Sequence, residues 1–162
     1  MEKIVKAIFL GRFQPFHKGH HHTVEKFKGR FEEFKIVIGS SSKFRISQNP
    51  LRFNERKKII RSCHPDLEIT GLEDEDKGSE GHREWVNKLI RNTETDKVIT
   101  RNELVKEIIR EYSEAEVVEH KLYRPEKYSG TNIRGKIREG KPWKELVPSC
   151  CRKEIIELSD KI

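Results

Sequence analysis

The sequence is short of several residue types, and each shortage excludes a class of protein. Its 162 residues include one Met, three Cys and two Gln. No uncharged apolar run approaches the roughly 18 residues that a membrane span needs. The first residues lead straight into a strand-like block and lack the layout of a signal peptide. With no repeat, low-complexity tract or linker, the chain is expected to form a single domain over residues 1–162, with no membrane partner.

The few cysteines are too sparse for a disulfide framework. Cys150 and Cys151 are adjacent, and Cys63 is far from both. Small secreted domains rely on many regularly spaced pairs, which this chain does not have. The cysteines are therefore expected to be structural, and the protein is expected to be cytoplasmic.

Charge is abundant and mixed in sign. Charged residues make up 38% of the chain and hydrophobic residues 33%, with a net charge of +7. A basic balance favours anionic partners, either nucleic acid or small phosphorylated ligands. Because Glu residues are interspersed throughout and no Lys/Arg block stands alone, we expect no nucleic-acid partner. The apolar residues come in clean blocks, which disordered chains lack.

Apolar blocks alternate with amphipathic stretches along the chain. Strands are expected at Lys3–Leu10, Glu33–Ser40, Leu67–Leu72, Lys97–Thr100 and Ala115–Glu119. Helices are expected at His20–Lys28, Arg52–Cys63, Gly81–Asn92 and Glu103–Tyr112, with one opening near Ser129 and a last one over Pro148–Lys161. This alternation predicts an α/β fold, with a doubly wound parallel sheet covered by helices on both faces. Ligands bind such sheets at the carboxyl ends of the strands.

A histidine motif directly follows the first expected strand. Residues 11–20 read GRFQPFHKGH, with Gly11 and Gly19 placed where backbone must turn or approach a ligand. His17 and His20 are three residues apart and are expected on one side of the first helical turn, where free N–H groups attract anions. A zinc site is disfavoured because no third ligand has a matching spacing. The motif predicts phosphate chemistry, with no role assigned to the following His21 and His22.

A second motif lies near the other end of the chain. Residues 128–134 read YSGTNIR, in which Ser129 is a good N-cap. Thr131 and the backbone amides after it would open a helix toward an anion, and Arg134 could clamp two phosphate oxygens. The alternative is a capped surface helix with a solvated Arg. The first motif favours the anion site.

Together the two motifs resemble the nucleotidyltransferase superfamily, and closely resemble the archaeal nicotinamide mononucleotide (NMN) adenylyltransferases. The resemblance extends from Ile4 to about Val147. Further blocks that agree in order and spacing are Ile38-Gly39-Ser40, Asn49-Pro50, Glu55-Arg56, Trp85-Val86, Asn102 and Leu122-Tyr123-Arg124.

The resemblance implies a Rossmann-like enzyme that transfers AMP from ATP to NMN, giving NAD and pyrophosphate. Mg2+ would be held mainly by phosphates, without protein side chains, and the enzyme would be a homo-oligomer. The residues implied as catalytic are His17, His20 and Arg134. Those implied in ATP binding are Gly11, Arg12, Phe13, Gly19, Ser129, Thr131 and Arg134, and those in acceptor binding are Trp85, Ser40 and Asn102. A flat aromatic face suits stacking on the nicotinamide ring, although Trp85 could instead be a core anchor.

Three segments depart from the family pattern. Gln48 stands where relatives carry an Arg, and Thr100-Arg101-Asn102-Glu103 replaces Ser-Gly-Asn-Pro. The stretch Glu73–Arg83 before Trp85 is more charged than expected, and its acidic residues, which include the run Glu73–Asp76, do not align cleanly. These changes concern acceptor recognition more than phosphate handling, so adenylyl or cytidylyl transfer to flavin mononucleotide or phosphopantetheine stays open. A further alternative is a non-enzymatic nucleotide- or nucleic-acid-binding module, suggested by the pI of 9.3.

Overall fold

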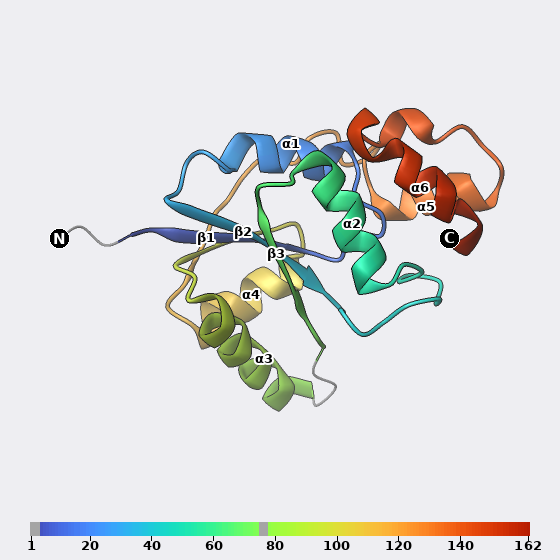
Figure 1. The fold of residues 1–162 in the computed structure, drawn as a ribbon. Helices are drawn as coiled ribbons and strands as arrows, with labels where there is room; N and C mark the ends of the chain where they lie inside the picture. The colour runs from blue at the N-terminus through green and yellow to red at the C-terminus, as the bar shows by residue number, and fades with distance from the viewer. Residues whose placement is uncertain (1–3, 75–77) are drawn as a thin grey trace.

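The fold is built around a five-stranded parallel sheet, seen in a computed structural model that describes residues 4–74 and 78–162 (Figure 1). The strand order is β3-β2-β1-β4-β5, and every neighbouring pair is parallel. The strands are β1 (Lys6–Gly11), β2 (Glu33–Gly39), β3 (Glu68–Leu72), β4 (Lys97–Thr100) and β5 (Glu116–Val117). The first strand is therefore central, and the chain winds outward from it in both directions, as predicted for a doubly wound sheet.

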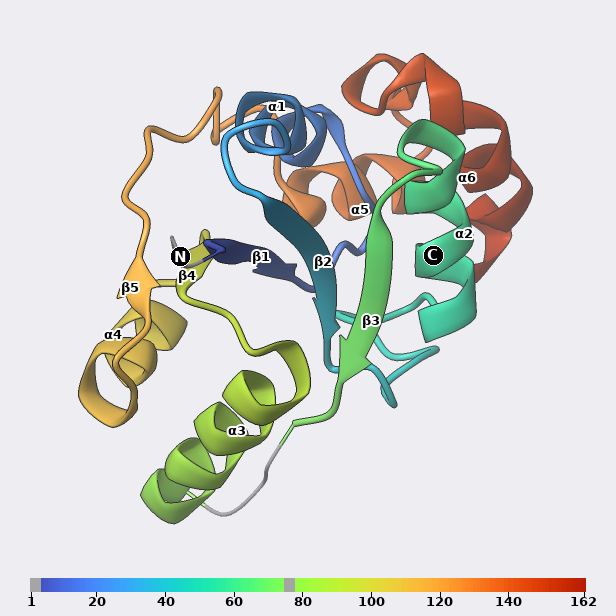
Figure 2. The same ribbon diagram turned by 60° about the vertical axis from the view of Figure 1, so that its left-hand side comes forward.

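In the described part of the chain, six α-helices cover the two faces of the sheet (Figures 1 and 2). They are α1 (Lys18–Phe27), α2 (Phe53–Cys63), α3 (Gly78–Thr93), α4 (Glu103–Tyr112), α5 (Gly130–Arg138) and α6 (Arg152–Leu158). In Figure 2, α3 and α4 lie on one face and the other four helices lie on the opposite face. None of the described helices combines the length and apolar character needed to cross a bilayer.

Alternation along the strands divides the core into two hydrophobic layers. Phe9 of β1 points into the layer beneath α1, α2, α5 and α6, whereas its neighbours Ile8 and Leu10 point toward α3 and α4. All three side chains are at most 4% exposed. Both faces of the central strand are thus buried, which explains its near-continuous apolar sequence.

The predicted elements are confirmed in type and order, with differences at the edges. The edge strand β5 is shorter than expected, because it pairs with β4 through only two residues, Glu116 and Val117. The last helix is not continuous. Residues Ser149–Cys151 and Ser159–Lys161 form 3-10 turns, η2 and η3, on either side of α6, and another turn, η1, spans Lys144–Leu146. The expected start of the first strand at Lys3 lies outside the described residues.

The three cysteines form one disulfide, which the sequence did not indicate, although they are too few for a disulfide framework. Cys63 at the end of α2 is bonded to Cys150 in η2, with their Cα atoms 5.2 Å apart and a sequence separation of 87. Sequence spacing could not reveal this pair, because only the fold brings these segments together. Cys151 is a free thiol in the core, and burial raises its pKa to about 12. The cysteine content therefore no longer indicates a compartment.

Candidate active site

A cavity of about 770 Å³ opens at the carboxyl ends of β1, β2 and β4. The strand order reverses here, because β1 lies between β2 and β4, and this is where doubly wound sheets bind ligands. The predicted site residues that line the cavity are Gly11, Arg12, Phe13, His17, His20, Ser40, Trp85, Asn102, Ser129, Thr131 and Arg134. Gly19 is the predicted residue absent from the described lining.

The two motif histidines cap the start of α1 reciprocally. His17 is the N-cap, and its Nδ1 accepts hydrogen bonds from the backbone N–H groups of Gly19 (3.1 Å) and His20 (3.3 Å). His20 Nδ1 accepts from the N–H of His17 at 3.2 Å. The two rings stack with their centroids 3.7 Å apart, and both are buried. This is a capping box in which imidazoles replace the usual hydroxyl and carboxylate.

Both histidines are neutral at pH 7. Burial lowers the pKa of His17 well below 6.5, and the Arg101 guanidinium lowers it further. Burial also lowers the pKa of His20, with smaller contributions from His17 and Arg101. Because each Nδ1 accepts a hydrogen bond, we assign the ring proton to Nε2 in both residues. Each ring therefore has one N–H group left to donate.

Arg101 is a site residue that the sequence marked only as a departure from a pattern. It follows β4 and lines the cavity, where its Nη1 lies 3.1 Å from His17 Nε2. With His17 in the assigned tautomer, two N–H groups face each other. Its Nη2 donates to the carbonyl of Tyr128, and no carboxylate pairs with it among the described side chains. An anion between Arg101 and His17 would accept from both donors.

Arg134 connects the two motifs. Its Nη1 donates to the carbonyl of Gln14 at 2.8 Å, while its buried Nε has no partner in the described part of the chain. Ser129 is the N-cap of α5, and its Oγ accepts from the N–H of Asn132 at 3.1 Å. Burial, Arg138 and Arg12 lower the pKa of Arg134, which indicates a site that holds excess positive charge.

Three glycines make space for these side chains. A Cβ on Gly130 would lie 2.6 Å from Arg134 Nη1, so a side chain there would displace the guanidinium. A Cβ on Gly19 would lie 2.9 Å from His17 Cε1. The space that the His17 ring needs therefore explains a glycine at this position, without a close approach of ligand to backbone. Gly11 similarly accommodates the ring of Phe13 at 3.0 Å. The sequence indicated the first-motif glycines but not the need for Gly130.

Arg56 holds the cavity loops from behind. Its side chain is 0% exposed and donates to the carbonyls of Arg12 (3.0 Å), Gly39 (2.9 Å) and Ser40 (3.1 Å). These carbonyls belong to the segments at the ends of β1 and β2. Burial lowers the pKa of this guanidinium to about 10, so it stays charged at neutral pH. The sequence offers Arg56 only as part of a family block, since nothing local distinguishes it from other arginines in α2.

The predicted acceptor residues lie at the β2, α3 and α4 side of the same cavity. Ser40 has a φ of 49° and donates from Oγ to Asp74 at 2.9 Å. Trp85 is half-buried and also packs against the layer beneath α3 and α4, so its core and cavity roles coexist. Asn102 Oδ1 accepts from the N–H of Val105 and caps α4.

The cavity has few groups that could hold a metal ion. Asp74 is the carboxylate among its described lining residues, and it already contacts Lys43 Nζ at 2.9 Å and Ser40. Glu73, the other described residue of the acidic run, is exposed and does not line the cavity, and residues 75 and 76 lie outside the described residues. Such a lining fits a divalent cation held by substrate phosphates, because Mg2+ often keeps few protein ligands.

Comparison with known proteins identifies similar sequences over most of the chain. A family model described as cytidylyltransferase-like matches residues 8–136. The chain is 35% identical over 169 residues to a nicotinamide-nucleotide adenylyltransferase of Ignicoccus hospitalis, covering 95% of this chain and 92% of that protein. It is 33% identical over 146 residues to the protein of the same name from Methanosarcina mazei, covering 90% and 84%.

Solved structures share the fold at lower identity. A bifunctional NMN adenylyltransferase/ADP ribose pyrophosphatase from Francisella tularensis superposes with a TM-score of 0.81 at 22% identity. The match covers 98% of this chain but only 50% of that one, so this chain spans half of the bifunctional protein. A second structure of the same description contains AMP and a manganese ion, with a TM-score of 0.70 over 91% of this chain and 45% of that one.

Proposed function

This chain belongs to the cytidylyltransferase-like family and, within it, to the nicotinamide-nucleotide adenylyltransferases, and from this membership we propose that it transfers AMP from ATP to NMN. The products are NAD and pyrophosphate. The observation that carries the proposal is the meeting of the two motifs in one cavity, where Arg134 donates to the carbonyl of Gln14. Neutral imidazole donors, guanidinium groups and helix N-termini suit a substrate rich in phosphate.

The reaction needs no protein nucleophile. A 5′-phosphate oxygen of NMN forms a bond to the α-phosphorus of ATP, and the bond from that phosphorus to the bridging oxygen breaks as pyrophosphate leaves. The attacking phosphate is already ionised at pH 7, so no general base is required. What remains is to hold two anions together and to neutralise charge in the transition state.

The chain's residues divide this work between them. The Nε2–H groups of His17 and His20 are proposed to donate to ATP phosphate oxygens, and both imidazoles are uncharged before ATP binds. Arg134, with Ser129, Thr131 and the first amides of α5, would hold the departing β- and γ-phosphates. Gly11, Arg12 and Phe13 would form the wall of the first loop beside the nucleotide.

A divalent cation, Mg2+ in this proposal, supplies charge neutralisation when it is bound. The described carboxylate Asp74 is engaged by Ser40 and Lys43, so the cation would be held chiefly by phosphate oxygens. On the acceptor side, the face of Trp85 is proposed to lie against the nicotinamide ring, with Ser40 and Asn102 as neighbouring polar groups.

The direct test is to incubate the purified protein with ATP, Mg2+ and NMN and to measure NAD with an NAD-dependent dehydrogenase. We expect NAD and pyrophosphate in equal amounts. A panel with flavin mononucleotide, phosphopantetheine and CTP tests the acceptor and the nucleotide separately. Pyrophosphate release with another acceptor but not with NMN would support nucleotidyl transfer as the reaction and contradict NMN as the acceptor. No product with any pair, from folded protein, would overturn the proposal.

Three further expectations from the sequence stay predictions, and the first of them rests on the family resemblance. The protein is proposed to be a homo-oligomer, which sedimentation velocity at micromolar concentration would measure. Its location in the cytoplasm stays a prediction that fractionation of the source cells would test. No nucleic-acid partner is expected, and binding that disappears at moderate salt would be non-specific.

A further inference from the structure

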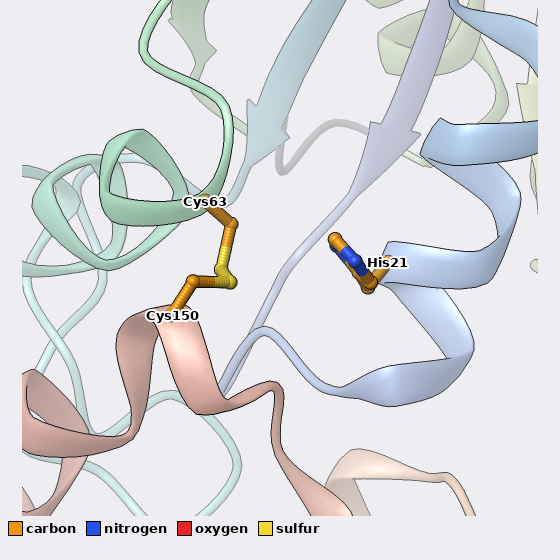
Figure 3. A group of neighbouring side chains, drawn as sticks. All are labelled: His21, Cys63 and Cys150. Atoms are coloured by element: carbon orange, nitrogen blue, oxygen red, sulfur yellow. A yellow bond between two sulfur atoms is a disulfide. The ribbon is translucent and has the colours of Figure 1, made fainter.

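A second group of reactive side chains lies outside the cavity. His21 on α1, Cys63 at the end of α2 and Cys150 in η2 form one group of possible metal ligands (Figure 3). His21 also belongs to an adjoining group with Glu25 of α1 and His64, the residue that follows α2. The ligand atoms of His21, Cys63 and Cys150 all lie within 4.8 Å of one another. His21 Nδ1 lies 3.0 Å from His64 Nε2. None of these side chains lines the cavity formed by the described residues.

We propose that His21, His64 and the two cysteines bind one zinc ion when the Cys63–Cys150 disulfide is reduced. Two thiolates and two imidazoles form a common ligand set for structural zinc. Reduction by a dithiol or a trialkylphosphine adds two electrons and two protons to the disulfide, and the reductant is oxidised to its disulfide or phosphine oxide. Zinc then replaces the two thiol protons, which are released to solvent. The zinc ion would replace the disulfide as the cross-link between these segments.

The positions of the two imidazoles fit such a site. Zinc–nitrogen bonds of about 2.0–2.1 Å give a tetrahedral site with nitrogen–nitrogen edges of about 3.3 Å. The observed 3.0 Å between His21 Nδ1 and His64 Nε2 is close to this edge. The two sulfur atoms have to separate to about 3.8 Å, which requires reduction because zinc and the disulfide cannot occupy the sulfurs together.

The surroundings of His64 supply a second observation. Its side chain is completely buried, and its Nδ1 has no hydrogen-bond partner within the part of the chain that the structure describes. Glu25 Oε1 is 3.8 Å from that Nδ1, and Glu25 lies one helical turn after His21 on α1. If His64 binds zinc through Nε2, its Nδ1–H points toward this carboxylate. Histidine ligands of zinc characteristically have such a carboxylate partner.

Cobalt titration tests the proposal spectroscopically. The full-length protein is reduced with a trialkylphosphine, freed of metal and titrated with Co2+. We expect one equivalent to bind, with thiolate-to-cobalt charge-transfer bands in the near ultraviolet and the visible bands of a tetrahedral ion. Zinc should displace the cobalt. Cys63→Ser, Cys150→Ser and His21→Leu should weaken binding by at least about 100-fold, and Glu25→Gln by about 10- to 100-fold.

Two neighbouring residues provide matched controls. Cys151→Ala removes the adjacent thiol, and His22→Leu removes the next imidazole, which stacks on Tyr123 instead. Both variants should bind cobalt like the unchanged protein. A variant-free measurement is alkylation with iodoacetamide, from which zinc should protect Cys63 and Cys150 in the reduced protein.

Three outcomes would overturn the proposal. The first is no stoichiometric cobalt or zinc binding by the reduced protein. The second is a cobalt spectrum without thiolate bands that the cysteine variants leave unchanged, which would indicate a site of His21, Glu25 and His64 only. The third is equal alkylation of Cys63 and Cys150 with and without zinc. None of these measurements depends on adenylyl transfer, so the two proposals fail separately.

Discussion

His20 combines local structure and chemistry in one imidazole ring. Its Nδ1 accepts from the N–H of His17, which leaves Nε2 as a donor at the cavity. We predict that His20→Asn lowers kcat by about two to four orders of magnitude, because the amide oxygen can accept at the cap but no group replaces the Nε2 donor. His20→Ala should be equally inactive and also less stable. Steady-state kinetics and thermal unfolding measure the two effects.

The control for this pair is His22→Ala, which removes a ring stacked on Tyr123 outside the described cavity lining. Its turnover should be unchanged. If His20→Asn kept near-normal turnover, the residue would serve only as a cap.

Arg101 should matter for ligand binding and not for folding. Its guanidinium is partly buried without a described carboxylate partner, which is unfavourable in the free protein. We predict that Arg101→Gln lowers kcat/KM by about 10- to 100-fold, since a hydrogen bond to a charged group contributes about 1.5–3 kcal/mol, and that it does not lower the melting temperature. Arg110→Gln, an exposed position paired with Glu119, is the matched control. A loss of stability with normal kinetics would instead indicate that Arg101 has a structural role through its hydrogen bond to the Tyr128 carbonyl.

Two glycines of α5 allow a comparison within one helix. A methyl group on Gly130 would overlap Arg134 Nη1, whereas one on Gly135 would meet nothing within 4 Å. We predict that Gly130→Ala lowers kcat/KM for ATP by at least about tenfold, and that Arg134→Lys adds little to it because both disturb one contact. Gly135→Ala should keep its kinetics and gain up to about 1 kcal/mol in stability. Additive losses in the double variant would show that Gly130 acts independently of Arg134.

At the scale of elements, Arg56 of α2 connects the segments that follow β1 and β2. It satisfies carbonyls of Arg12, Gly39 and Ser40 from a fully buried position. We predict that Arg56→Lys lowers the free energy of unfolding by about 2–4 kcal/mol, because an ammonium cannot reach all of these acceptors and each one left unsatisfied costs about 1–3 kcal/mol. Denaturant unfolding measures this, with the exposed Arg61→Lys as control. Equal stability of both variants would contradict the prediction.

The elements were predictable wherever a local pattern determines them. Continuous apolar runs identify β1 and β2, and the apolar face of residues such as Ile108 and Ile109 identifies α4. The edge was less predictable, because the length of β5 depends on its pairing with β4, which involves only Lys97 and Val98 and which no local pattern specifies. The break before α6 and the disulfide at Cys150 depend on the packing of distant segments, which no local pattern encodes.

The site likewise contains residues that the sequence predicts and residues that only the fold identifies. The histidines and Arg134 belong to motifs whose spacing is visible in the sequence. Arg101 and Gly130 acquire their roles only from the distances to His17 and Arg134 in the fold. Residues whose roles depend on tertiary contacts can be identified only from the three-dimensional structure.

For the whole molecule, the buried histidines predict a dependence of stability on pH. The pKa values of His17 and His20 are below 6.5 in the folded protein, chiefly because of burial, whereas unfolding restores values near 6.5. The unfolded chain therefore binds more protons just below pH 6.5, and stability falls as the pH is lowered through that region. Each histidine contributes up to about 1.4 kcal/mol per pH unit.

The comparison is with a His17→Asn/His20→Asn double variant, because Asn is a good N-cap that does not titrate. Its free energy of unfolding, measured by denaturant titration between pH 7 and 5 in a phosphate-free buffer, should fall less steeply. Equal slopes for the two proteins would mean that the histidines are not held neutral by the fold.

The two motifs that meet in the cavity are far apart in the sequence, so they leave the ribosome at different times. His17 and His20 are translated early, but Arg134 follows more than a hundred residues later. At about 5–20 residues per second, the first motif leaves the ribosome roughly 6–23 s before its partner. For most of that interval the nascent chain lacks β4 beside β1, and throughout it lacks the guanidinium that meets Gln14. Adenylyl transfer can therefore begin only after nearly all of the chain has been synthesised. An activity assay during translation would thus report the concentration of nearly complete chains.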